Sequence, residues 1–89
     1  MARKNRSAEK RHRQSLVRRA RNRAVRTRVR HQIRKVREAI ARGDAAAAAA
    51  ELKEATRIIT KAASKGVLHR NTASRYVARL SRKVASLAA

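Results

Sequence analysis

Basic side chains dominate the first 37 residues, and the chemistry that they offer is the recognition of phosphate. Residues 1–37 contain sixteen Lys or Arg side chains against a single acid, Glu9, and so hold +15 of a net charge of +21. Thirteen of the sixteen are arginine, whose planar guanidinium makes bidentate hydrogen bonds to phosphate and stacks on exposed bases. The rest of the chain is also basic and cannot neutralise this charge. The pattern therefore predicts an external, structured polyanion as the ligand.

The acidic residues form no catalytic pattern. Only five are present, and they are scattered along the chain, so paired carboxylates for general acid–base catalysis are not found. We therefore predict that the chain is not an enzyme and has no small-molecule substrate. The acids have structural roles instead: a helix cap for Asp44, and ion pairs of Glu38 with Arg34 or Arg42 and of Glu54 with Arg57.

The histidines do not predict a metal site. His12, His31 and His69 have no His or carboxylate three or four residues later, so no helical metal-binding pair forms, and we expect no metal and no other cofactor. Contact with nucleic acid or packing accounts for them better. For His69, a local hydrogen bond and contact with RNA remain equal alternatives. Tyr76, the only aromatic residue, is expected in the core.

The composition indicates an all-α protein with one small domain. The chain has 89 residues, no Pro, no Cys and two Gly, and strong helix formers dominate it. No apolar run is long enough to span a membrane. Proteins that bind single strands stack bases on several aromatic side chains, which this chain lacks. Recognition of the backbone of a folded nucleic acid is favoured instead.

Caps and glycine stops predict three helices separated by short turns. Met1–Arg6 has no periodicity, and we expect no regular structure there. The predicted helices run from Ser7 as N-cap to Arg42 with Gly43 as the stop, from Asp44 to about Ser64 with Gly66 as the stop, and onward from Asn71 as N-cap.

Apolar residues at helical spacing predict one buried stripe on each helix. The stripe of the first helix begins only at Val25. At about 1.5 Å per residue the first helix is roughly 54 Å long and the second roughly 30 Å, so the second ends near Arg23. We therefore predict an antiparallel three-helix bundle over residues 24–89, with residues 1–23 continuing the first helix as a projecting basic arm. The stripes are Val25, Val29, Ile33, Val36 and Ile40; Ala48, Leu52, Ala55, Ile59 and Ala62, with Ile58 at the edge; and Ala73, Val77, Leu80, Val84 and Leu87.

Cations surround the first helix instead of gathering opposite an apolar face, which is untypical of a membrane-surface helix. Arg19, Arg23, Arg26, Arg30 and Arg37 share one flank. The third helix carries a second basic stripe, opposite its apolar seam, formed by Arg75, Arg79 and Arg82. We expect the arm to be disordered or fraying until it meets its ligand.

Two alternatives to an RNA-binding arm remain. An architectural DNA binder stays open, although no helix-turn-helix, zinc-finger or leucine-zipper pattern is present. An Arg-rich, acid-poor N-terminus is also typical of a mitochondrial transit peptide. Against a cleavable leader, the charge continues to Arg37 without a change of composition.

Three blocks of sequence resemble the family of the twentieth protein of the bacterial small ribosomal subunit, over nearly the whole chain. The third block is the most specific, since a generic basic helix has no reason to contain it. The blocks are residues 7–23, with SA, KRHRQ and RNR; residues 35–44, with KVREAI and GD; and residues 61–80, with KAASKGVLHRNTASR and RL.

This resemblance implies a structural protein of the cytoplasmic ribosome that binds the 5′ part of small-subunit ribosomal RNA, as a monomer within the particle. A long first helix among RNA helices, backed by a three-helix bundle, is implied as well. Bacterial or organellar origin stays open. The family's contacts carry over to Lys10, Arg11, Arg13, Arg21, Arg23, Lys65, Arg70 and Arg75. The full set of expected RNA-binding residues is Arg3, Lys4, Arg6, Ser7, Lys10, Arg11, His12, Arg13, Gln14, Arg18, Arg21, Asn22, Arg23, Arg26, Arg28, Arg30, Lys35, Lys65, His69, Arg70, Asn71, Arg75, Arg79 and Arg82.

Overall fold

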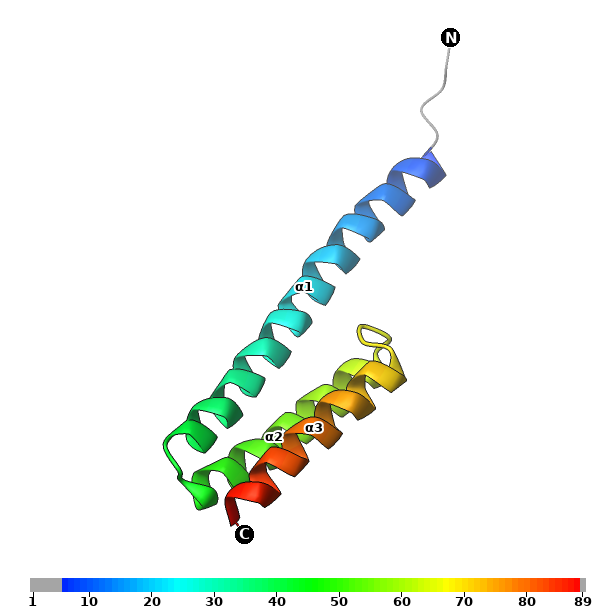
Figure 1. The fold of residues 1–89 in the computed structure, drawn as a ribbon. Helices are drawn as coiled ribbons and strands as arrows, with labels where there is room; N and C mark the ends of the chain where they lie inside the picture. Colours follow the sequence, from blue (N-terminus) through cyan, green and yellow to red (C-terminus); the bar gives the residue numbers. More distant parts are fainter. Residues whose placement is uncertain (1–5, 89) are drawn as a thin grey trace.

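Three α-helices follow one another in residues 6–88, the part of the chain that this computed structural model describes (Figure 1). They are α1 (Arg6–Ala41), α2 (Ala45–Ser64) and α3 (Arg70–Ala88). Each runs antiparallel to the one before it, and α1 extends well beyond the other two at its N-terminal end. The predicted all-α bundle with a long, projecting first helix is confirmed.

The turn between α1 and α2 is built around Gly43, whose φ of +72° lies in the left-handed region. The N–H of Gly43 bonds to the carbonyl of Ile40 at 3.0 Å, and the N–H of Asp44 bonds to that of Ala39 at 3.1 Å. This pair of bonds is a Schellman motif, which closes a helix with glycine at C′. Asp44 then caps α2, because its Oδ1 accepts the N–H of Ala47 at 3.0 Å. The stop and the cap are both as predicted.

The turn after α2 repeats the same motif at Gly66, where φ is +77°. The N–H of Gly66 bonds to the carbonyl of Ala63, and the N–H of Val67 bonds to that of Ala62, both at 3.0 Å. Gly66 therefore ends α2, as the sequence predicts.

The predicted starts of α1 and α3 are wrong, because both helices begin earlier along the chain. Helix α1 already includes Arg6, so Ser7 lies in its first turn and not at its N-cap. In α3 the carbonyl of His69 accepts the first intrahelical bond, from Ala73 at 3.0 Å. The carbonyl of the N-cap residue does this, so His69 and not Asn71 caps α3. The expectation for residues 1–5 lies outside the described part of the chain.

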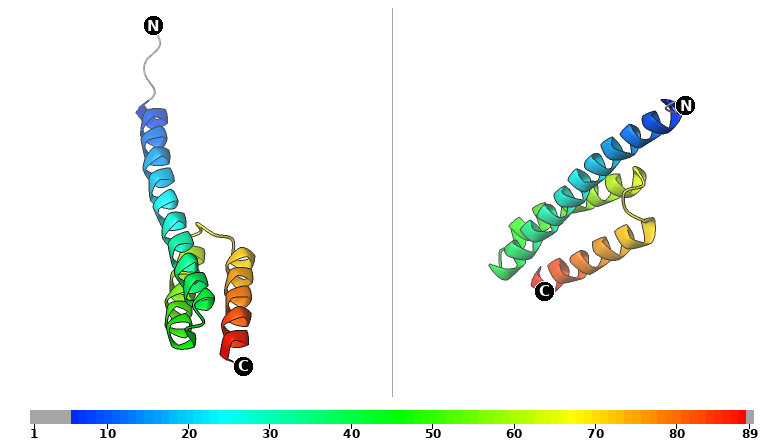
Figure 2. Two further views of the ribbon diagram at one scale, coloured as in Figure 1. Left: turned by 60° about the vertical axis from the view of Figure 1, so that its left-hand side comes forward. Right: turned by 90° about the horizontal axis from the view of Figure 1, so that it is seen from above.

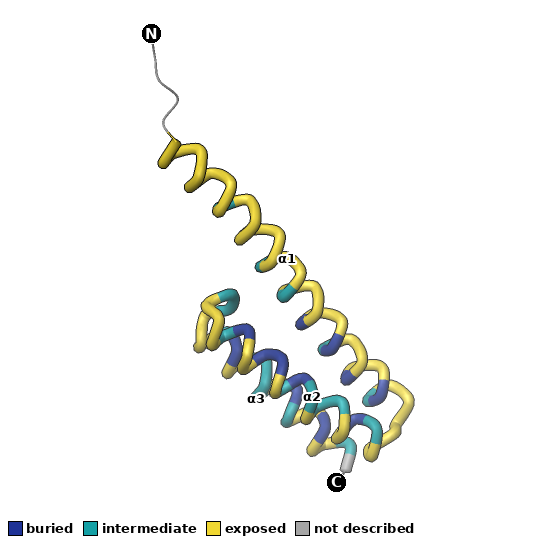
Figure 3. Tube along the Cα trace, turned by 180° about the vertical axis from the view of Figure 1, so that it is seen from behind, coloured by how far each residue is buried: buried dark blue, intermediate teal, exposed yellow. Residues whose placement is uncertain are grey.

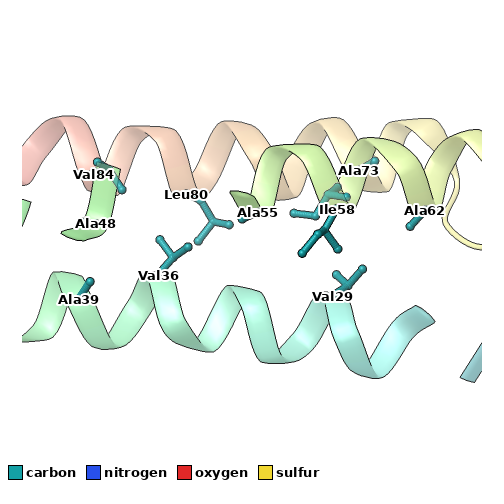
Figure 4. Packing of buried hydrophobic residues seen from close by; sticks show 11 residues of the cluster. Val29, Val36, Ala39, Ala48, Ala55, Ile58, Ala62, Ala73, Leu80 and Val84 are labelled. Atoms are coloured by element: carbon teal, nitrogen blue, oxygen red, sulfur yellow. The ribbon is translucent and has the colours of Figure 1, made fainter. Parts of the chain in front are cut away.

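The core lies between α2 and the C-terminal half of α1, with α3 packed on α2 (Figures 3 and 4). The predicted stripes supply most of it, but Ile58, expected at the edge, is buried, and Ala39 was missed. Several predicted core residues are only partly buried against this cluster, among them Tyr76. The buried hydrophobic residues are Val29, Val36, Ala39, Ala48, Ala55, Ile58, Ile59, Ala62, Ala73, Leu80 and Val84.

One polar residue, Gln32, is buried between α1 and α2, with only 6% of its surface exposed. Its Nε2 donates to the carbonyl oxygen of Glu51 at 3.0 Å and to Oε2 of the same residue at 2.6 Å. Both bonds cross from α1 to α2, so they fix the register of the two helices. A periodicity of apolar residues could not reveal this contact.

Helix α2 is the common neighbour of the other two helices. Helices α1 and α3 each pack closely along α2, whereas contacts between α1 and α3 are sparse. Both views in Figure 2 show α3 lying apart from α1. The flank of α1 that faces α3 therefore stays accessible.

Candidate nucleic-acid interface

The structure describes the basic arm, which we define as residues 1–23, from Arg6 onward. This described part of α1 lies beyond the end of the bundle. Figure 3 shows this half of α1 exposed along almost its whole length. Only Ser15 and Asn22 are partly shielded. Polyanions can therefore approach from several sides. The exposed basic residues here are Arg6, Lys10, Arg11, Arg13, Arg18, Arg19, Arg21 and Arg23, and His12 and Gln14 are exposed with them.

Where the arm meets the bundle, Lys65 of the turn between α2 and α3 joins the cations of the arm. Arg18, Arg21 and Asn22 of α1 line a hollow of about 410 Å³ together with Lys65 and Gly66 of the turn. Four of these five were predicted to bind RNA from separate parts of the sequence. The structure brings them together at one place, with no acid among the residues lining the hollow.

A second basic surface is the groove between α1 and α3, with a volume of about 600 Å³. We call it the α1–α3 groove. Only Arg30 and Arg79 of the predicted set lie in it, and Arg79 thus turns toward α1 while Arg75 and Arg82 stay on the exposed outer face of α3. Its lining is Arg30, Ile33, Arg34 and Arg37 from α1 and Tyr76, Arg79, Leu80 and Lys83 from α3.

The sequence reasoning missed Arg34, Arg37 and Lys83 as candidate ligand-binding residues. A weak signal was present, because Arg30, Arg34 and Arg37 are spaced by four and three residues and so share one flank of α1. What the spacing could not give is the position of α3, which brings Arg79 and Lys83 opposite that flank.

The opposite flank of α1 has a different electrostatic character. There Arg28 and Lys35 line a hollow with Glu51 and Glu54 of α2. The pKa of Glu54 is lowered, first by the hydrogen bond from Arg57 and then by the charges of Arg57, Arg28 and Lys35. Arg28 and Lys35, both predicted to bind RNA, are therefore partly balanced by carboxylates of their own chain.

The predicted ion pairs are confirmed in one case and wrong in the other. Arg57 pairs with Glu54: its Nε donates to Oε2 at 3.1 Å, and its Nη2 donates to Oε1. Within residues 6–88, Glu38 makes no ion pair with Arg34 or Arg42. Those arginines thus remain available to other anions.

The start of α3 holds three more predicted residues. His69 Nδ1 accepts the N–H of Asn71 at 3.1 Å, so the structure shows the local hydrogen bond of the two alternatives for this histidine. Arg70 and Asn71 are exposed, as is Arg26 on α1. Arg3 and Lys4 lie outside the described residues.

The described residues contain neither a metal-binding cluster nor a membrane-spanning helix. Between residues 6 and 88, no three His, Asp or Glu side chains come together in a way that could hold a metal ion. Over the same range, none of the helices combines the length and the apolar character that crossing a membrane demands.

Comparison with known proteins places the chain in a family. The sequence profile of the family described as ribosomal protein S20 matches residues 3–85. The small ribosomal subunit protein bS20 of Anaeromyxobacter dehalogenans (strain 2CP-C) is 59% identical over 83 residues, which cover 93% of this chain and 90% of the relative. The proteins of the same name from Solidesulfovibrio magneticus and Rhizobium meliloti are 56% and 54% identical, over 88% and 93% of this chain and 88% and 94% of the relatives. The chain therefore belongs to the ribosomal protein S20 family.

Proposed function

We propose that the protein is a structural constituent of the small ribosomal subunit in the cytoplasm, and that it binds folded small-subunit ribosomal RNA directly. The ribosomal role is supported by its family, whose named relatives are small ribosomal subunit proteins. This is a family of ribosomal proteins and not of enzymes, in line with the prediction from the acids. Direct RNA binding rests on one observation, the exposed arm, whose described residues include eight Lys or Arg against the single acid Glu9.

The proposed mechanism is neutralisation of phosphate on more than one RNA segment. The arm places guanidinium groups on several sides of a single rod, so phosphates on either side of it can be contacted at once. Reduced repulsion then lets the RNA helices pack against each other. The arm and the C-terminal half of α1 form one continuous helix, and the core holds that C-terminal half. The bundle therefore determines the direction in which the arm projects. The boundary between the arm (residues 1–23) and the bundle (residues 24–89) is part of this proposal.

All residues predicted from the sequence to bind RNA remain part of the proposal, with different weights. Arg18, Arg21, Asn22 and Lys65 carry the most, since no acid lines the hollow that they share. Arg28 and Lys35 carry less, because Glu51 and Glu54 lie beside them. The 5′ part of the RNA as target and a single copy in each particle are proposed on the resemblance alone.

Salt dependence of binding tests the proposal. If about six to ten cations each displace a counterion, the logarithm of the association constant falls against the logarithm of salt concentration with a slope of magnitude roughly 4 to 9. The measurement is a filter-binding titration on a fragment of the 5′ domain at several salt concentrations. A slope near 1 would contradict the mechanism.

Competition with duplex DNA at matched salt distinguishes the proposal from an architectural DNA binder. We expect unlabelled ribosomal RNA to displace the labelled fragment at much lower concentration than DNA does. Equal displacement by the two would favour the DNA-binding alternative.

A further inference from the structure

The α1–α3 groove is lined by five cations that come from two different helices. Arg30, Arg34 and Arg37 form one wall, and Arg79 and Lys83 form the other, while Glu and Asp are missing from the lining. All five are exposed. Five cations facing one space repel each other and gain from an anion between them.

The cations of the groove continue those of the arm. Arg19, Arg23 and Arg26 precede Arg30 at spacings of four, three and four residues, and therefore lie on the same flank of α1. Successive members are about one helical turn, or roughly 5.4 Å, apart along the axis. Such a row suits the regularly spaced phosphates of a nucleic-acid strand. An isolated anion would use only one or two of them.

The shape of the groove limits what can enter it. Both walls belong to helices that pack on α2, and the floor is formed by Ile33 and Leu80 with Tyr76 beside them. A space of about 600 Å³ between two helices is too small for a duplex, whose grooves themselves admit an α-helix. It suits one sugar–phosphate strand, contacted from both sides.

We propose that the α1–α3 groove binds a single sugar–phosphate strand of ribosomal RNA, which follows the arginine row from the arm onto the bundle. The proposal rests on the proposed function and adds five residues to its interface, Arg19 of the arm and four residues of the groove. Arg34, Arg37 and Lys83 contact phosphates, and Tyr76 offers an aromatic surface to the sugar or base of the same strand. The bundle thus binds RNA itself as well as supporting the arm.

Tyr76 makes the groove directly observable, because it is the only tyrosine of the chain. Biosynthetic incorporation of 3-fluorotyrosine gives the full-length protein a single ¹⁹F resonance at the floor of the groove. We expect this resonance to shift when the 5′-domain RNA fragment is added in equimolar amount. A matched pair of double variants shows whether the groove contributes to affinity.

The groove variant, Arg34→Gln with Lys83→Gln, removes one cation from each wall. The control, Arg42→Gln with Lys53→Gln, removes the same two residue types at exposed positions outside the groove. We expect the groove variant to bind the RNA roughly tenfold more weakly and to lower the salt slope by about 2. The control is expected to change both much less. Unchanged far-UV circular dichroism shows that both variants fold.

The outcomes separate this proposal from the proposed function. An unshifted resonance and equal affinities of the two variants, with tight and RNA-selective binding by the wild type, would overturn the groove proposal alone. Wild-type protein that does not prefer the RNA to DNA would overturn both.

Discussion

His69 caps α3 through Nδ1, which accepts the N–H of Asn71 at 3.1 Å. Replacement by Ala removes the acceptor, and loss of an N-cap costs about 1 kcal/mol of unfolding free energy. His69→Asn keeps a capping oxygen, so we expect stability close to that of the wild type. Urea unfolding followed by circular dichroism measures both.

RNA affinity of the same two variants separates capping from direct contact. If His69 acts only as a cap, His69→Asn binds RNA as tightly as the wild type does. A loss of affinity in the Asn variant without a loss of stability would show that the imidazole itself contacts RNA.

Individual buried positions were predictable where chemistry and pattern agreed. Val29, Val36 and Ile59 are apolar, occur at helical spacing and are buried. The burial of Gln32 could not be predicted in this way, because it depends on Glu51, 19 residues away, which accepts the hydrogen bonds of its amide. Long-range pairing of two polar groups leaves no periodic trace in a sequence.

At the level of elements, the turn at Gly43 depends on its left-handed backbone. A Cβ at this position meets nothing within 4 Å, so the cost of Gly43→Ala is purely conformational, about 1–2 kcal/mol. We expect this loss of unfolding free energy in thermal or urea denaturation. Gly43→Asn is the control, because Asn tolerates the left-handed region better, and it should lose less. If Gly43→Ala and Gly43→Asn lost the same unfolding free energy, the cost would not come from the left-handed backbone at this position.

The helices and their turns could be predicted because glycine stops, the Asp44 cap and apolar periodicity are local signals. The α1–α3 groove could not, because it depends on how far apart two helices lie when both pack on a third. Arg79 illustrates the difference. Its position on a wheel places it opposite the seam of α3, yet the arrangement of the helices makes it part of a wall shared with α1.

At the scale of the whole molecule, α1 belongs to two environments. Its first buried residue is Val29, with Val25 partly buried before it, so no described residue of the arm packs into the core. Isolated helices of this length are marginal in water, and repulsion among neighbouring arginines weakens the arm further. The bundle end has the core of three helices to hold it. The two halves of one helix should therefore open independently of each other.

Amide hydrogen exchange of the full-length protein measures this difference residue by residue. Without RNA, we expect fast exchange from Ser7 to about Arg23 and protection that rises from Val25 onward. Equimolar 5′-domain RNA should slow exchange in the arm, because binding selects its helical form. Uniform protection from Ser7 in the free protein would contradict this, since it would mean that the arm is stable without a ligand. Slowing confined to the bundle would instead place the RNA on the α1–α3 groove and leave the arm unbound.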